Sequence, residues 1–269
     1  MKKYILFILM AFIITYTFIG VDVKSIGEYI CGTSDDVVEY NTGTLKEYLK
    51  STYYSSYDIT SIRIEENDKF LIDECKNYRQ RDLNNYYNRY KNYTTEEDKV
   101  GGTCSVVAAV STVLFYDNYD KLYQIDDNGK YVFFSKLLDE ALKKKYTTKS
   151  DGTEKGMINN LLSLAYDLAE SNRYGNTEWY HIKKKLNKSL NKGVPEMFSL
   201  KGHTVVVCGY TTFTFTVTYE KKKMLKTFKE TKGAYIVNDG WGNPNRSIVF
   251  KDKIGNITNG HQLTISSKK

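Results

Sequence analysis

The stretch Gly101-Gly102-Thr103-Cys104-Ser105-Val106-Val107-Ala108-Ala109-Val110-Ser111-Thr112-Val113-Leu114-Phe115-Tyr116 decides the fold. Its apolar run is longer than a typical buried strand and is long enough for three helical turns. The β-branched residues favour a strand, so the helix prediction depends on length and on the Gly-Gly-Thr start, where Thr103 can act as the N-cap. A helix that is apolar on all sides belongs at the centre of a domain.

Cys104 would then occupy the first turn of this central helix. The free N–H groups and the positive end of the helix dipole favour a thiolate there over a thiol. A nucleophilic cysteine is therefore one interpretation. The alternative is a small core residue, since free cysteine is among the most buried residue types.

The composition is that of a globular chain. Its 269 residues allow one large domain, or one domain with an N-terminal extension, and 41% are hydrophobic, which is enough for a core. Basic residues exceed acidic ones by 39 to 32, but they are scattered, with short clusters at Lys143–Lys145, Lys183–Lys185 and Lys221–Lys223. We expect these clusters on solvated helix faces or hairpin tips, and we expect no nucleic-acid partner.

Residues 1–25 have the pattern of a targeting segment. Lys2 and Lys3 precede an uncharged, mainly apolar run over residues 4–21. A positive start before such a run is typical of a secretory signal peptide. The run also reaches the length of a membrane span, so an uncleaved membrane anchor through residues 4–21 is the alternative. In both cases we expect the remaining chain to be secreted or held at the extracellular surface.

Export changes the interpretation of the four cysteines. A disulfide between Cys31 and Cys75 is permitted outside the cell, because both precede the predicted central helix. Cys208 lies in an apolar strand and is expected in the core, which leaves Cys104 as a free thiol. No Cys or His spacing resembles a structural zinc site, and we expect no cofactor.

Residues 26–95 form a separate region in front of a core over residues 96–269. The predicted elements of this region are a helix over Thr44–Tyr54, a strand over Ile59–Ile64 and a helix over Cys75–Tyr93. The region is either a propeptide that covers the site until cleavage or an arm packed permanently on the core. Thr94–Lys99 has the composition of the connecting loop.

The core changes from helices to strands along its length. After the central helix we expect a hairpin over Tyr123–Ile125 and Tyr131–Phe134, then helices over Leu137–Lys145, Met157–Ser171 and Trp179–Leu190. Strands are expected over Val194–Leu200, Thr204–Tyr210, Thr211–Tyr219, Met224–Glu230, Ala234–Val237, Ser247–Phe250 and Leu263–Ser266, with a charged hairpin tip over Glu220–Lys223. Helices followed by an antiparallel sheet define an α+β domain.

His203 is the best-placed base among three histidines, because it starts a buried strand after a Gly turn. A thiol nucleophile needs a base that can later protonate the leaving amine, and imidazole titrates in the right range. The base also needs a third group to fix its tautomer and ring plane. Asn238 and Asp239 end the next buried strand, and only one of them can face the imidazole because successive side chains alternate in direction. The alternatives are a structural histidine at a strand edge and a simple Asn-Asp-Gly turn.

Three blocks stand in the order Cys, His, Asn or Asp: the cysteine helix, Gly202–Tyr210 and Tyr235–Gly242. Together these blocks resemble papain-like cysteine peptidases of the streptopain and bacteriocin-leader-peptidase type, over about residues 94–266. The resemblance implies a papain-like fold, in which a helical half with a central cysteine helix packs on an antiparallel sheet half. It also implies an exported enzyme that hydrolyses protein or peptide substrates.

By this resemblance Cys104 is the nucleophile and His203 is the base. Streptopain-like spacing assigns the orienting role to Asn238, whereas papain-like and leader-peptidase spacing assigns it to Asp239. The oxyanion glutamine of papain-like enzymes is missing from its usual place, because Asp98 stands there and no glutamine lies between Gln80 and Cys104. One donor would be the Cys104 N–H, and a second would come from Thr103, Asn92 or the Trp241 indole.

Two other functions fit the same residues. The missing glutamine suits a non-catalytic binding or adhesion module on this fold. Acyl transfer by the same triad, such as transglutamination, is a further alternative.

Overall fold

The computed structural model describes residues 29–30, 35–116, 127–170, 173–179, 186–200, 202–241, 246–253 and 259–267. The export segment predicted over residues 1–25 lies outside these ranges, as does Cys31. Within them, no helix has the length and apolar character that a membrane crossing requires.

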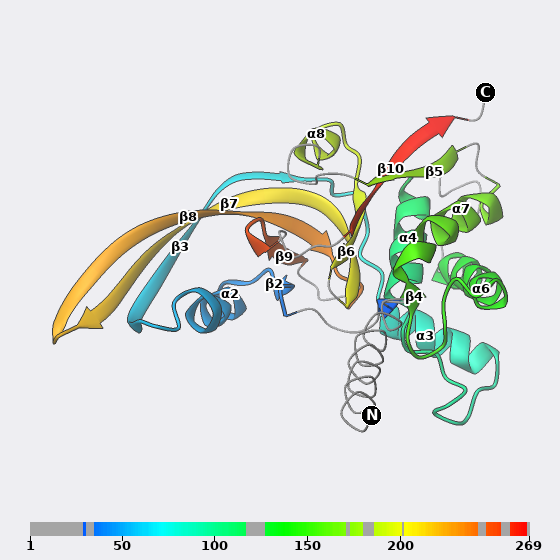
Figure 1. Cartoon of the computed structure of the whole chain (residues 1–269), viewed down its shortest axis with the longest axis horizontal. Coiled ribbons are helices and arrows are strands. Elements are labelled where there is room, and N and C mark those ends of the chain that lie inside the picture. Colours follow the sequence, from blue (N-terminus) through cyan, green and yellow to red (C-terminus); the bar gives the residue numbers. More distant parts are fainter. Residues whose placement is uncertain are drawn as a thin grey trace, which may run out of the picture.

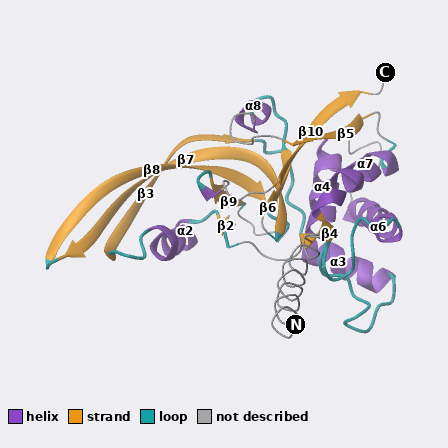
Figure 2. Cartoon of the chain, in the orientation of Figure 1, coloured by secondary structure: helices purple, strands orange, loops and turns teal. Residues whose placement is uncertain are grey.

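A helical cluster and a long curved sheet make up the described chain (Figures 1 and 2). The cluster contains α3 (Gln80–Tyr90), α4 (Cys104–Tyr116), α6 (Asp127–Lys143) and α7 (Ile158–Leu168). The sheet contains β2 (Val38–Glu39), β3 (Asp58–Leu71), β5 (Arg173–Trp179), β6 (Glu196–Leu200), β7 (His203–Lys221), β8 (Met224–Asn238), β9 (Ser247–Phe250) and β10 (Asn259–Ser267). Its strand order is β2-β9-β8-β7-β6-β10-β5, with β3 paired to β7, and every pairing is antiparallel. The α+β class predicted from the sequence is therefore confirmed.

Smaller elements complete the described chain. They are α2 (Thr42–Tyr48), the π-helical turn η2 (Leu49–Tyr53), the 3-10 turn η3 (Lys155–Met157), α8 (Leu186–Leu190), and the short pair β1 (Tyr29–Ile30) and β4 (Thr153–Glu154).

The predicted central helix is α4, and it is buried on every side from Cys104 to Leu114. It lies between the sheet and helices α6 and α7. Thr103 immediately precedes α4, and its hydroxyl donates a hydrogen bond to Asn84 Oδ1 at 2.5 Å. This bond ties the start of α4 to α3.

A long hairpin of β7 and β8 runs away from the helices and pairs with β3 to form a three-stranded arm (Figure 1). The sequence predicted four shorter strands here. The first two form the single strand β7, and the last two form the single strand β8. The interruption expected near Gly209 is a bulge in the register. A Cβ at this position would lie 2.3 Å from the Phe70 carbonyl oxygen, so β3 can approach β7 closely only because residue 209 is glycine.

Two predictions in the helical half are wrong. Tyr131–Phe134, expected in a hairpin, lies within α6, because the turn-like Asp127-Asn128-Gly129 forms the first helical turn. The helix buries an apolar face that includes Phe133, Phe134, Leu137, Leu138 and Ala141. The partner segment Tyr123–Ile125 lies outside the described residues. Trp179, expected to start a helix, ends β5 instead.

The region before the core is built into the same sheet. Strand β3 follows β7 from Asp58 opposite Glu220 to Leu71 opposite Gly209, and β2 pairs with β9. Side chains of this region also enter the common core, among them Leu45, Leu49, Ile62, Leu83 and Tyr87. These contacts favour the packed-arm alternative, and removal of residues 26–95 stays a prediction.

Candidate functional site

The candidate site lies where the N-terminus of α4 meets the start of β7. Ser105 Oγ and Thr204 Oγ1 are 2.8 Å apart and share a buried hydrogen bond. These residues directly follow Cys104 and His203, so the bond brings the backbone at the two predicted catalytic residues to one junction. Because successive side chains on a strand point to opposite faces, the His203 ring points away from the Thr204 hydroxyl. Both are enclosed: Cys104 is 2% exposed and His203 is 0% exposed.

The His203 ring is held on two sides. Its Nε2 lies 2.8 Å from the backbone oxygen of Asp239. A carbonyl oxygen only accepts, so Nε2 carries the proton and the basic lone pair of the neutral ring is on Nδ1. The indole of Trp241 stacks on the ring, with centroids 4.7 Å apart and planes 18° from parallel. The main chain at Asp239 thus fixes the tautomer, and Trp241 fixes the ring plane.

Asn238 and Asp239, the two predicted orienting residues, direct their side chains to other partners. Asn238 Nδ2 donates to the carbonyl oxygen of Cys75 at 3.0 Å. The Asp239 carboxylate accepts hydrogen bonds from the backbone N–H of Trp241, at 2.8 Å, and from Ser247 Oγ. His203 contacts the predicted turn, but its hydrogen bond is made with the Asp239 backbone carbonyl and not with either predicted side chain.

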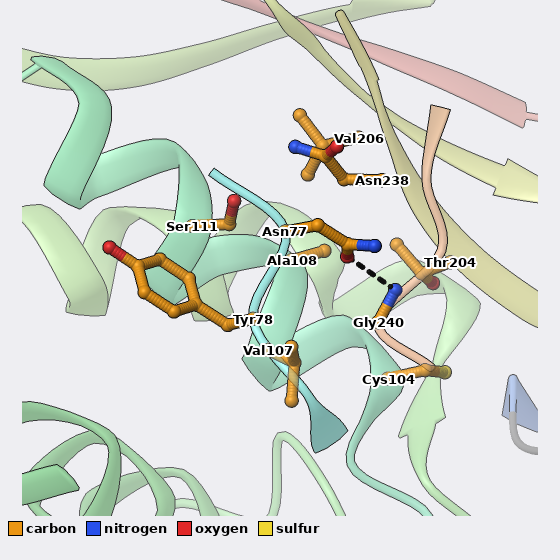
Figure 3. A pocket seen from close by; sticks show the side chains of 10 residues that line it. All are labelled: Asn77, Tyr78, Cys104, Val107, Ala108, Ser111, Thr204, Val206, Asn238 and Gly240. Atoms are coloured by element: carbon orange, nitrogen blue, oxygen red, sulfur yellow. Dashed lines mark hydrogen bonds between the residues drawn. The ribbon is translucent and has the colours of Figure 1, made fainter. Parts of the chain in front are cut away.

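The segment Cys75–Gln80 leads into α3 and crosses between α4 and the turn at Gly240. We call this segment the strap. Ser111 on α4 donates to the carbonyl oxygen of Lys76 at 2.8 Å. Asn77 Oδ1 accepts from the Gly240 N–H at 3.1 Å (Figure 3), and the Gln80 N–H donates to the Gly240 carbonyl oxygen at 2.6 Å. Gly240 has φ +76°, a conformation that favours glycine. The strap therefore joins the helical half to the turn that orients His203.

Beneath the strap is a small cavity of about 10 Å³. Its lining is Asn77, Tyr78, Cys104, Val107, Ala108, Ser111, Thr204, Val206, Asn238 and Gly240 (Figure 3). This volume is about the minimum for one water molecule. The cavity therefore does not accommodate a peptide.

The structure separates the predicted oxyanion donors. The Thr103 N–H donates to the Gly101 carbonyl oxygen at 3.0 Å and its hydroxyl donates to Asn84, so both donors are engaged. Asn92 is exposed just beyond the C-terminal end of α3, the end opposite Gln80. Trp241 lies at the site, stacked on His203.

Gln80 lies beside the loop that leads into α4, a position that the sequence analysis did not predict. Its Nε2 donates to the Gly101 carbonyl oxygen at 2.7 Å, three residues before Cys104. Because all of α3 lies between Gln80 and Cys104, a search of the few residues before the cysteine misses it. The only signal in the sequence is the scarcity of glutamine, which occurs at positions 80, 124 and 262.

The other two described thiols flank Asn238. Asn238 Nδ2 lies 3.4 Å from Cys75 Sγ, and Cys208 Sγ lies 3.7 Å from Asn238 Oδ1. Burial raises the pKa of the Cys75 thiol strongly, and it raises the pKa of Cys208 to about 11 against the opposing effect of Arg246. Cys208 packs in the core as predicted. Cys75 is a free cysteine, and Cys31, its permitted disulfide partner, lies outside the described residues.

Comparisons with protein-family models, with curated proteins and with solved structures find no match. The resemblance to papain-like peptidases therefore depends on the three sequence blocks alone. Across the ranges that the structure describes, no group of three or more His, Cys, Asp or Glu side chains is arranged to hold a metal ion.

Proposed function

We propose that this chain is an exported papain-like cysteine peptidase that hydrolyses peptide bonds, with Cys104 as the nucleophile and His203 as the base. The observation that carries the proposal is the buried bond between Ser105 and Thr204. It joins the residues that follow the two catalytic candidates, although 99 positions separate them. The start of a buried helix is also where a thiolate is stabilised most easily.

The chemistry follows from the tautomer of His203. Nδ1 takes the proton of the Cys104 thiol, and the thiolate attacks the carbonyl carbon of the scissile peptide bond. The imidazolium then protonates the departing amine, and the C–N bond breaks to leave a thioester on Cys104. Water, deprotonated by Nδ1, attacks the thioester, and the thiolate leaves with release of the acid product. The Asp239 carbonyl oxygen holds the Nε2 proton throughout.

The tetrahedral oxyanion needs donors near the start of α4. The Cys104 N–H stands in the first turn of α4, where main-chain N–H groups point out of the helix end. We assign the second donor to Gln80, whose amide is anchored 2.7 Å from the Gly101 carbonyl oxygen. The Gln80 side chain would turn from that oxygen to the oxyanion when a substrate is bound.

Catalysis requires the closed site to open. At 2% exposure the Cys104 sulfur is out of reach of a substrate carbonyl. Trp241 is partly exposed and stacks on His203, so displacement of its indole is the simplest way to uncover the ring.

The test compares Cys104→Ala with Cys208→Ala, which removes a buried thiol that the proposed mechanism does not use. Each protein is treated with an epoxide thiol probe and assayed on casein and on a peptide library. We expect the Cys104 variant to lose both labelling and turnover and the Cys208 variant to retain both. Equal labelling of the wild-type and Cys104→Ala proteins would remove Cys104 from the mechanism.

A second function is favoured by the closed site itself, namely a non-catalytic binding or adhesion module on the same fold. A buried thiol and a cavity of one-water size suit a chain whose site is structural only. This alternative predicts a folded wild-type protein with no turnover on any substrate. Crosslinked product on addition of an amine acceptor would indicate acyl transfer instead of hydrolysis.

A further inference from the structure

The far end of the β3–β7–β8 arm carries a compact basic and apolar tip, which we call the arm tip. It consists of the exposed Lys221, Lys222, Lys223, Met224, Leu225 and Lys226 with the neighbouring Tyr57 and Tyr219. Met224 is 56% exposed and Leu225 is 67% exposed. Four lysines and two exposed aliphatic side chains thus share one hairpin end.

The backbone of this turn is strained. Lys221 pairs with Met224 in the ladder, so Lys222 and Lys223 form a two-residue loop, with φ values of 54° and 60°. Two positive φ angles are the signature of a type I′ turn, which favours Asn-Gly or Asp-Gly. The Cβ atom makes this conformation unfavourable, because it comes too close to a backbone carbonyl oxygen. Two adjacent lysines therefore occupy positions where glycine or asparagine folds more easily, and strain of this kind is common at functional surfaces.

Aromatic rings lie beside the lysines. Tyr57 and Tyr219 pack edge to face, with centroids 4.8 Å apart, and both contact Phe228. Tyr57 is 42% exposed. Tyrosine and lysine are enriched where proteins meet the headgroup layer of a membrane, because each combines an apolar body with a polar end.

The charges at the arm tip favour an anionic partner. The acidic residues among its nearest strand positions are Glu220 and Asp58, which lie opposite each other in the β3–β7 ladder. The four lysines outnumber them. A narrow hairpin end offers too little area for a stable protein interface, which needs about 800 Å² from each partner. A bilayer needs only a few lysines near anionic headgroups and an apolar apex that enters the interface.

We propose that the arm tip docks on an anionic phospholipid bilayer, with Met224 and Leu225 entering the headgroup region and the lysines contacting lipid phosphates and carboxylates. The arm extends away from α3, α4, α6 and α7 (Figure 1). A tip bound to a bilayer therefore leaves the Cys104 site on the other side of the molecule. This proposal is independent of whether Cys104 is catalytic.

The test measures flotation of the full chain with vesicles of phosphatidylcholine, alone and mixed with phosphatidylserine. The first variant carries Lys221→Glu, Lys222→Glu and Lys223→Glu, and the second carries Met224→Ser and Leu225→Ser. The matched control carries Lys143→Glu, Lys144→Glu and Lys145→Glu, an exposed triplet at the end of α6 with the same change in charge. The segment over residues 4–21 is identical in all four proteins, so its contribution cancels.

We expect the wild-type and control proteins to bind phosphatidylserine vesicles more tightly than phosphatidylcholine vesicles, with the difference reduced by added salt. The Lys221–Lys223 variant should lose at least about tenfold of this phosphatidylserine-dependent affinity. The Met224 and Leu225 variant should also bind more weakly. Equal binding of the tip variants and the wild type would overturn the proposal. So would tighter binding of the wild type to duplex DNA than to phosphatidylserine vesicles at the same salt.

Discussion

Trp241 covers one face of the His203 ring, with the two ring centroids 4.7 Å apart. The turn after β8 produces this contact. The β7–β8 ladder ends where Val206 lies opposite Asn238, and the chain then turns at Gly240, whose φ is +76°. The turn lays the Trp241 indole on the His203 ring, and the stack excludes water from a fully buried imidazole.

Replacement of Trp241 by alanine should uncover His203. Without the indole the ring becomes accessible to water, so diethylpyrocarbonate should modify His203 much faster than in the wild type. Trp241→Phe, which retains an aromatic face, should preserve most of the protection. Peptide mass spectrometry measures the rate at His203. Equally fast modification of the wild type would show that Trp241 does not close the site.

Replacement of Gln80 by alanine tests its assignment as an oxyanion donor. Loss of one donor typically lowers kcat by about 100- to 1000-fold, and KM should change little. Gln80→Glu should be equally impaired, because a carboxylate cannot donate. Asn85→Ala, an exposed change on the same helix, is the control. If Gln80→Ala kept full kcat but lowered the melting temperature, the side chain would serve only to brace Gly101.

Cys208 should make the protein sensitive to alkali. Burial raises its pKa from an ordinary value of 9.0 to about 11, so the folded state holds the thiol proton more tightly than the unfolded chain. This stabilisation is complete below about pH 9 and is lost as the pH rises toward 11. Its upper limit is about 3 kcal/mol. Urea unfolding across this range should show a shallower fall in stability for Cys208→Ala. Parallel curves for the two proteins would contradict the assignment.

A cut in the loop Thr94–Lys99 should leave the two fragments associated. Residues 94–98 are exposed, whereas the preceding region supplies a strand and core side chains to the main sheet. After limited proteolysis, gel filtration should show both fragments in one peak of native size. Dissociation of the N-terminal fragment without denaturant would support a removable propeptide. Cleavage of the wild type but not of Cys104→Ala during storage would further show that the chain cuts itself.

The elements that the sequence predicted well are those with strong local patterns. The apolar run after Cys104 and the periodic face of Ile158–Leu168 are helices, and Ser247–Phe250 is a strand with the predicted bounds. Asp127-Asn128-Gly129 was predicted as a hairpin turn, but turn residues also suit the first turn of a helix. The segment forms α6, which buries Phe133 and Phe134. Local preference was overridden there by packing.

Around the site, the sequence gives the order of the candidate residues along the chain, but it does not give the directions in which their side chains point. The bond between Ser105 and Thr204 joins the start of α4 to the start of β7, and His203 contacts the turn at Asp239. The role of a backbone carbonyl is invisible in a side-chain pattern, so the ring contact at Asp239 was assigned to the wrong group. Gln80 was missed because its position depends on the strap, which turns back toward Gly240 before α3 begins.

The pairing of β3 with β7 sets an order for folding during synthesis. Leu71 meets Gly209 only after the chain between them has been made, so β3 is synthesised long before its partner. During that interval its backbone donors and acceptors form an open edge that other chains can join. Newly made copies of this chain are therefore most exposed to aggregation in the interval before β7 is complete.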